Sequence, residues 1–230
     1  KEKGLEPLAE LLFSFTLKGA DLEEIAKEYI NEEKGVETAE DALQGASDII
    51  AEIISDSAEA RKLLKELIDK TGIIRSVAKK EEDSVYSMYY DYSEAVKKIP
   101  SHRILAINRG ENEEFLKVTV EVNEDEAIKI LNNLFITEGS SSTDFCKESV
   151  KDSYSRLIFP SLEREIRSNL TEKADEQAIK MFGSNLKPLL MQPPIKNKTV
   201  LAVDPAYRTG CKLAIVDGNS KVLFTGVIYP

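Results

Sequence analysis

Few side chains in this 230-residue sequence belong to the types that perform chemistry. The two cysteines, Cys146 and Cys211, lie far apart with no CxxC pair, and His102 is the single histidine. A zinc site, a disulfide framework and a metal centre built on two histidines are therefore not expected. No GxxxxGKS, GxxxxGKT or GxGxxG loop occurs, which excludes the common phosphate-binding loops. Unpaired cysteines fit a reducing cytoplasm.

Asp204 is the remaining candidate for catalysis. It ends the apolar run Thr199-Val-Leu-Ala-Val-Asp204, which predicts a buried strand that closes on a carboxylate. Two-metal chemistry needs several convergent carboxylates, and the next acid, Asp217, is expected in a turn. We therefore predict no metal, no cofactor and no enzymatic activity for this chain, with Asp204 as a vestigial site residue.

Basic residues are concentrated in one third of the chain. Residues 1–150 carry 19 Lys and Arg against 33 Asp and Glu, a net charge of −14. Residues 151–212 carry 11 against 7, a net charge of +4. Because phosphates are bound by cationic side chains, any contact with nucleic acid is expected from this stretch. The candidate contact residues are Arg156, Arg164, Arg167, Lys173 and Arg208.

Two of these arginines allow a second interpretation. Arg164 and Arg167 are three residues apart, so they are expected on neighbouring points of one helix face. They could meet phosphates there, or they could pair with acidic side chains where two helices meet. The binding that is expected is weak in either case, because the net charge of the chain is −10 and repels phosphate at long range.

Four tyrosines occur within seven residues, between Tyr86 and Tyr92. Such a cluster can stack on bases, or its half-buried rings can pack one helix on another. Acids flank the cluster instead of arginines, which favours packing.

Apolar side chains recur at helical spacing through most of the first 191 residues. Thr38 and Asp41 have the spacing of a capping box at the start of one long helix. Gly72 and Gly183 are expected to end helices, and Pro160 to kink a helix or begin a new one. A flexible loop is predicted for 138–144.

A short helix and a strand are predicted in the middle of this helical region. Ser101 is the expected N-cap of the helix, with Gly110 beyond its end. Alternation over 115–122 then predicts a strand.

The period changes after Pro193-Pro194. We expect a helical domain over 1–191, a linker over 192–198 and three antiparallel strands over 199–230, joined in part by a hairpin turn at 217–220. The predicted fold class is mainly α, a multi-helical domain with a short β excursion, followed by the start of an RNase H-like sheet. Three strands do not bury a sheet by themselves, so we expect this chain to be part of a longer protein. No charge-free stretch is long enough to cross a membrane.

Three segments resemble the Tex family of bacterial transcription accessory proteins. The first is Ile99-Pro-Ser-His-Arg-Ile-Leu-Ala-Ile-Asn-Arg-Gly-Glu111, and the second runs from Arg156-Leu-Ile-Phe-Pro-Ser-Leu-Glu-Arg-Glu165 to Asn185-Leu-Lys-Pro-Leu-Leu190. The third, Val200-Leu-Ala-Val-Asp-Pro-Ala-Tyr-Arg-Thr-Gly-Cys-Lys-Leu-Ala-Ile-Val-Asp217, is similar to the start of the family's YqgF-like domain. One departure is Ala206, where family members often have glycine, so an ordinary negative φ is expected there.

The resemblance implies a fragment of a cytoplasmic nucleic-acid-binding protein that acts in transcription. It implies further domains beyond both ends, including an OB-fold RNA-binding domain, and a degenerate RNase H-like site. The expected role of this chain is a structural scaffold for those domains, with nucleic acid and the transcription machinery as partners of the whole protein and no contact with membranes. The alternatives are a metal-dependent nuclease or resolvase, which rests on Asp204, and a helical protein-interaction module.

Overall fold

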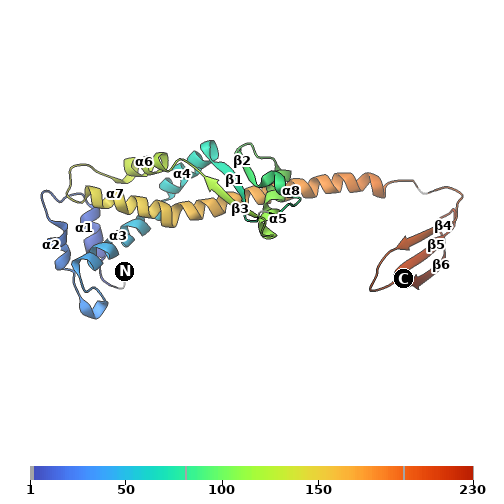
Figure 1. Ribbon diagram of the computed structural model, residues 1–230, viewed down its shortest axis with the longest axis horizontal. Helices are drawn as coiled ribbons and strands as arrows, with labels where there is room; N and C mark the ends of the chain where they lie inside the picture. The colour runs from blue at the N-terminus through green and yellow to red at the C-terminus, as the bar shows by residue number, and fades with distance from the viewer. Residues whose placement is uncertain (1–2, 81, 194, 230) are drawn as a thin grey trace. The chain divides into compact units, whose positions relative to one another are not determined.

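The computed structural model describes residues 3–80, 82–193 and 195–229. The chain divides into two compact units, Lys1–Ala178 and Ile179–Pro230. The first unit is helical with one small sheet, and the second holds the end of a long helix and a second sheet (Figure 1). The predicted fold class is confirmed. The proline pair at which the boundary was predicted includes Pro194, which lies outside the described residues.

In chain order, the α-helices are α1 (Glu6–Phe13), α2 (Leu22–Lys27), α3 (Ala39–Ser55), α4 (Ala58–Thr71), α5 (Ser101–Asn112), α6 (Glu124–Phe135), α7 (Thr143–Asp152) and α8 (Phe159–Leu190). The shorter helical segments are the 3-10 helices η1 (Glu32–Lys34) and η2 (Ser87–Tyr89) and the π-helix η3 (Ser153–Ile158). The strands are β1 (Ile73–Ala78), β2 (Asp91–Ala95), β3 (Leu116–Glu121), β4 (Val200–Asp204), β5 (Cys211–Val216) and β6 (Val222–Ile228).

Helix α3 is the centre of the helical packing. It begins at the predicted capping box, in which the Thr38 hydroxyl accepts from the Asp41 N–H and the Asp41 carboxylate accepts from the Thr38 N–H. Its apolar stripe is fully buried at Ala46, Ile50 and Ile54. Helices α1, α2 and α7 and the segment η3 all pack against it.

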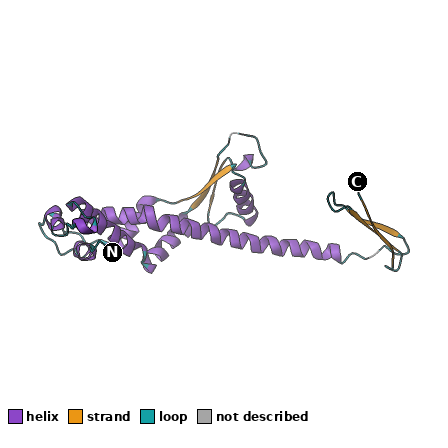
Figure 2. Ribbon diagram, turned by 90° about the horizontal axis from the view of Figure 1, so that it is seen from below, coloured by secondary structure: helices purple, strands orange, loops and turns teal. Residues whose placement is uncertain are grey.

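The segments α7, η3 and α8 form one uninterrupted helical run from Thr143 to Leu190 (Figure 2). The π-helix lies directly before Pro160, where a kink or a new helix start was predicted. Proline has no N–H to donate to the carbonyl four residues earlier, and the Phe159 N–H already bonds five residues back, to the Tyr154 carbonyl. The wider π turn therefore lets the helix continue through the proline.

The predicted helix end at Gly183 is wrong. A glycine ends a helix when its backbone leaves the helical conformation, as Gly72 does at the end of α4, and Gly183 keeps the helical conformation and has no positive φ. In a helix interior, glycine costs only about 1 kcal/mol relative to alanine. Helix α8 therefore runs on to Leu190, with Pro188 inside its last turn.

The β excursion is larger than the single strand predicted over 115–122. Strands β2, β1 and β3 form an antiparallel sheet in that spatial order, so the central strand β1 was not anticipated. Strand β1 follows Gly72 directly, and Ile74 and Ser76 are its buried positions. Ile73 is exposed and Ser76 is buried, so apolar and polar side chains do not alternate along β1, which explains the omission.

The tyrosine cluster packs as expected, but against the sheet and not between helices. Tyr86 and Tyr89 are buried next to β1 and β3. The Tyr86 ring lies 5.7 Å from the Phe115 ring, and the Tyr89 ring meets the Tyr92 ring edge-on at 5.3 Å. These rings form the apolar cover of one end of the sheet.

Helix α5 has different ends from those predicted. Pro100 is its N-cap residue, Ser101 is its first helical residue, and Gly110 lies inside the last turn. Gly110 is needed because the helix passes close to β3. A Cβ atom at this position would lie 2.6 Å from Cδ1 of Leu116, which is fully buried.

The loop predicted to be flexible over 138–144 is held by hydrogen bonds to the N-terminal region. The Ser140 hydroxyl donates to the Leu17 carbonyl at 2.9 Å, and the Ser142 hydroxyl donates to the Leu12 carbonyl at 2.7 Å. Ser142 is fully buried. Serine-rich composition suggested flexibility, but here each hydroxyl satisfies a backbone group.

The second unit confirms the three predicted strands. Strands β4, β5 and β6 are antiparallel in chain order, and the Asp217 carboxylate closes the predicted hairpin turn by accepting from the Asn219 and Lys221 N–H groups. Ala206 has no positive φ, as expected, whereas Gly210 has φ +78°. Within the described residues, no helix is long and apolar enough to cross a membrane.

We predict opposite effects for alanine at two helical glycines. Gly110→Ala should lower the free energy of unfolding by about 1–3 kcal/mol, because the new methyl group overpacks the contact with Leu116. Gly183→Ala is the matched control, since a Cβ atom there would meet no other side chain of the described residues within 4 Å. It should leave stability unchanged or raise it by up to about 1 kcal/mol. Urea unfolding measures both, and equal effects would contradict the close packing of α5 on β3.

We also predict that the two thiols differ in reactivity. Cys146 is fully buried, and this burial raises the pKa of its thiol to about 11. Because the thiolate is the reacting form, a thiol reagent at pH 8 should modify Cys146 only after unfolding. Cys211 is partly exposed and should be modified in the native protein. Mass spectrometry of the labelled peptides distinguishes the two, and rapid native labelling of Cys146 would disprove this account.

Candidate nucleic-acid interface

The outer edge of β3 is covered by charged side chains from the helices. β3 is an edge strand, so the N–H and C=O groups on its outer side have no neighbouring strand. The Val120 N–H donates to Glu163 of α8 at 2.7 Å, and the Val118 N–H donates to Glu111 of α5 at 3.2 Å. Arg167 of α8 donates to the Val118 carbonyl at 3.3 Å.

Arg167 is therefore directed into the protein. Its guanidinium also forms an ion pair with Glu111 and bonds the Asn108 side chain at 3.4 Å. Only 26% of its side chain and 28% of the Glu111 side chain are exposed. Arg167 was predicted either to meet phosphates or to pair with an acid where two helices meet. The structure shows the second arrangement, because Arg167 of α8 pairs with Glu111 of α5.

Arg156 is also engaged by acids. It forms a bidentate contact with Asp152 one turn earlier and reaches Asp48 of α3 at 2.8 Å. Asp152 raises the pKa of this guanidinium, which stays charged throughout the physiological range. Two carboxylates therefore offset its charge at the junction of α3 and η3.

Three candidates of the predicted interface have no such partner. Arg164, Lys173 and Arg208 are exposed, and within the described residues no carboxylate lies within 4 Å of their charged groups. The Arg164 Nε donates to the Pro160 carbonyl one turn earlier. Arg164 and Lys173 are nine residues apart on α8, which places them on opposite sides of the helix. The structure does not bring them together into one basic patch.

The neighbouring acids of α8 are used in the same way. Glu165 accepts from Lys65 of α4 at 2.5 Å and lies 3.7 Å from Arg61. This contact joins α4 to α8. It lies on a different side of α8 from the contact that Glu163 makes with β3. The charged side chains of Glu163, Glu165 and Arg167 therefore bind α8 to other elements of the helical unit.

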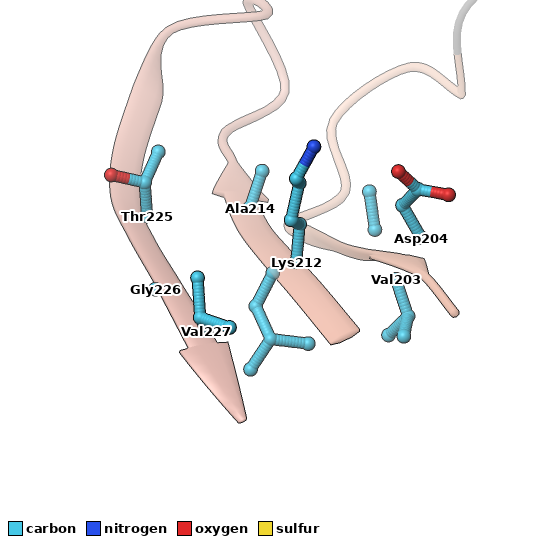
Figure 3. A pocket seen from close by; sticks show the side chains of 9 residues that line it. Val203, Asp204, Lys212, Ala214, Thr225, Gly226 and Val227 are labelled. Carbon is cyan, nitrogen blue, oxygen red and sulfur yellow. The ribbon is translucent and has the colours of Figure 1, made fainter. Parts of the chain in front are cut away.

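Asp204 lies on one face of the second sheet together with small and polar side chains. In the register of the sheet, Asp204 is opposite Lys212, and Ala202 is opposite Ala214. Asp204, Lys212, Ala214 and Thr225 point to the same side, whereas Val203 points to the other (Figure 3). A shallow hollow of about 550 Å³ lies over this region.

The residues of this face do not by themselves make the metal site that the predicted RNase H-like domain implies. Among residues 195–229 the acids are Asp204 and Asp217, and Asp217 is held in the hairpin turn. The cross-strand neighbour of Asp204 is an ammonium group, where a divalent cation needs a second carboxylate. No group of three or more metal-ligating side chains occurs in the described part of the chain.

Three important residues were missing from the sequence interpretation. Glu111 and Glu163 were not recognised as partners of the outer edge of β3. Which edge of β3 is free depends on its pairing with β1, and β1 was not predicted. Lys212 could have been found, since the predicted strands and hairpin already set it near Asp204.

A helical unit with one small sheet, followed by a second three-stranded antiparallel sheet, describes the architecture of this protein, and comparison with known proteins gives the family. A family model for the Tex central region matches residues 18–182, and a model for the Tex protein YqgF-like domain matches residues 198–230. The chain belongs to the Tex family.

Named relatives agree with this assignment. The chain is similar to the uncharacterized protein YdcI of Bacillus subtilis, with 51% identity over 236 residues, which cover all of this chain and 32% of that protein. It is 34% identical to Protein tex of Bordetella pertussis over 247 residues, all of this chain and 31% of that protein. It is also 34% identical to the human S1 RNA-binding domain-containing protein 1 over 216 residues, 85% of this chain and 21% of that protein. The chain thus spans about a third or less of these relatives.

We predict that two arginines three residues apart on α8 differ strongly in their effect on stability. Arg167→Ala removes hydrogen bonds to Glu111 and to the β3 edge, and should cost about 1–3 kcal/mol of unfolding free energy. Arg164→Ala, the matched control on the exposed side, should change it by no more than about 0.5 kcal/mol. Chemical denaturation compares the two variants. Equal unfolding free energies would show that the hydrogen bonds to the outer edge of β3 contribute little to stability.

Proposed function

We propose that this chain is a non-catalytic scaffold within a nucleic-acid-associated protein, and that the tight nucleic-acid contacts are made by domains outside it. The observation that carries the proposal is that Arg156 and Arg167 of the basic stretch already pair with carboxylates of this chain, namely Asp48, Asp152 and Glu111. Cations that already neutralise carboxylates of the same protein release few counterions on phosphate binding.

The names of relatives support an association with nucleic acid and transcription. One relative is named for an S1 RNA-binding domain, and a relative from Neisseria gonorrhoeae, 34% identical over 239 residues, is named Transcriptional accessory protein Tex. We propose RNA or DNA as the partner of the whole protein, and the transcription machinery as a second partner. The free thiols of Cys146 and Cys211 suit a reducing compartment, so the proposal places the protein in the cytoplasm.

The proposal includes the absence of nuclease activity in this chain. Asp204 faces Lys212, and a carboxylate next to an ammonium group is a poor ligand for Mg²⁺ or Mn²⁺. The small side chains of Ala202 and Ala214 leave the hollow without further ligands.

A binding titration tests the scaffold role. The chain and the full-length protein are titrated with duplex DNA and with single-stranded RNA at low and moderate salt. We expect the chain to bind at least 100-fold more weakly than the full-length protein, with residual binding that falls with salt and is reduced by Arg164→Ala with Lys173→Ala. Equal affinities of the two proteins would overturn the proposal, and salt-independent binding by the chain would remove its electrostatic basis.

A nuclease assay tests the second part. With Mg²⁺ or Mn²⁺ present, we expect no cleavage of single-stranded or duplex substrates above the level of the Asp204→Asn variant. Metal-dependent cleavage that Asp204→Asn abolishes would favour the nuclease alternative instead.

A further inference from the structure

The two compact units of the chain carry net charges of opposite sign. The second unit, Ile179–Pro230, contains 7 Lys and Arg against 2 Asp and Glu, a net charge of +5. The first unit, Lys1–Ala178, contains 24 against 39, a net charge of −15. A polyanion that approaches this chain is therefore attracted by the second unit and repelled by the first.

The cations of the second unit are exposed and are not paired with acids. Within the described residues, no carboxylate lies within 4 Å of their charged groups. In this respect they differ from Arg156 and Arg167 of the first unit, whose charges are offset by carboxylates. The seven exposed cations are Lys180, Lys187, Lys196, Lys198, Arg208, Lys212 and Lys221.

The second unit also presents all the exposed aromatic side chains of the described residues. Phe182, Tyr207, Phe224 and Tyr229 are 67%, 93%, 54% and 73% exposed. In the described part of the first unit, every aromatic side chain is buried or half-buried, including the tyrosine cluster. Exposed rings among cations are typical of surfaces that bind single-stranded nucleic acid, because the phosphates meet the cations and unpaired bases stack on the rings.

Two of these rings lie at the end of the sheet where β4 leads into β5. We call residues 205–210 the β4–β5 loop, and it contains Tyr207, whereas Tyr229 directly follows β6. Gly210 closes the loop against β6 with φ +78°, and a Cβ atom at this position would lie 2.9 Å from Cε1 of Tyr229. The loop therefore holds Tyr207 and Arg208 at the same end of the sheet as Tyr229.

Arg208 is the unpaired cation at this end of the sheet. Asp204 and Lys212 are opposite each other in the register and point to the same side, so together they add no net charge (Figure 3). Arg208 is exposed and adjoins Tyr207 in the sequence. A guanidinium next to an exposed ring offers a phosphate contact and a stacking surface side by side.

We propose that the β4–β5 loop is a contact site for single-stranded nucleic acid, with bases stacked on Tyr207 and Tyr229 and a phosphate bound by Arg208. The lysines of the second unit attract the strand. This site deepens the proposed function, on which it rests, because it assigns the residual binding of the chain mainly to the second unit. Duplexes are poorer ligands, since their bases already stack on one another.

Fluorescence anisotropy of this chain at low salt tests the site with three probes. A short oligouridine offers phosphates and unpaired bases, an RNA duplex of the same length offers phosphates and paired bases, and inorganic polyphosphate offers phosphates alone. We expect Tyr207→Ser to weaken oligouridine binding by about 5-fold or more and to leave polyphosphate binding unchanged. Tyr207→Phe is the matched control, because it keeps the ring, and it should bind oligouridine as the unaltered chain does.

Two arginine variants test the charge at the site. Arg208→Ala should weaken the binding of both oligouridine and polyphosphate, whereas Arg164→Ala, at an exposed cation of the acidic unit, should have a smaller effect on each. Oligouridine binding that is equal in Tyr207→Ser and Tyr207→Phe would overturn stacking at the loop. Binding that is unchanged in Arg208→Ala, or a duplex bound more tightly than oligouridine, would overturn the site as well.

A second experiment uses the full-length protein. It is irradiated in complex with single-stranded RNA that contains 4-thiouridine, and the crosslinked peptides are identified by mass spectrometry. We expect crosslinks in the β4–β5 loop that are lost in Tyr207→Ser with Arg208→Ala. Crosslinks confined to domains outside this chain would disprove the site and leave the scaffold role intact. Failure of the scaffold role has a different signature, namely equal affinity of this chain and the full-length protein.

Discussion

The outer edge of β3 is the constraint on which the helical unit depends. Backbone groups that are shielded from water must find partners, and an edge strand has half of its N–H and C=O groups unpaired. Here Glu163 and Arg167 of α8 and Glu111 of α5 supply them. These side chains reach the strand only when α5, α8 and the sheet are in register, so one set of charge-assisted hydrogen bonds positions three elements.

This constraint also explains the segment 99–111, which lies within the match to the Tex central region. Asn108 donates to Thr171 of α8 at 2.8 Å, Arg103 pairs with Glu94 of β2 at 2.9 Å, and Gly110 admits the buried Leu116. The segment is the joint between helix and sheet, and its residues are used for packing.

The distribution of charge along the sequence differs from the charge presented by the fold. The stretch from 151 to 212 has a net charge of +4, yet Arg156 and Arg167 neutralise acids that come mainly from other segments. What the helical unit presents is a largely acidic surface, because residues 1–150 carry a net charge of −14. Such a surface repels phosphates at long range.

Most of the helices, the three strands of the second unit and the family could be predicted from the sequence, because these depend on local period, capping residues and short motifs. The capping box at Thr38 and the hairpin turn at Asp217 are decided within four residues of chain. The roles of Arg167 and Glu163 and the existence of β1 became apparent only in the folded chain. Strand β1 exposes Ile73 and buries Ser76, so its apolar and polar side chains do not alternate, and a charged helix face looks the same whether it meets water or a strand edge. The distinction lies in contacts between residues more than forty positions apart, and only folding brings these together.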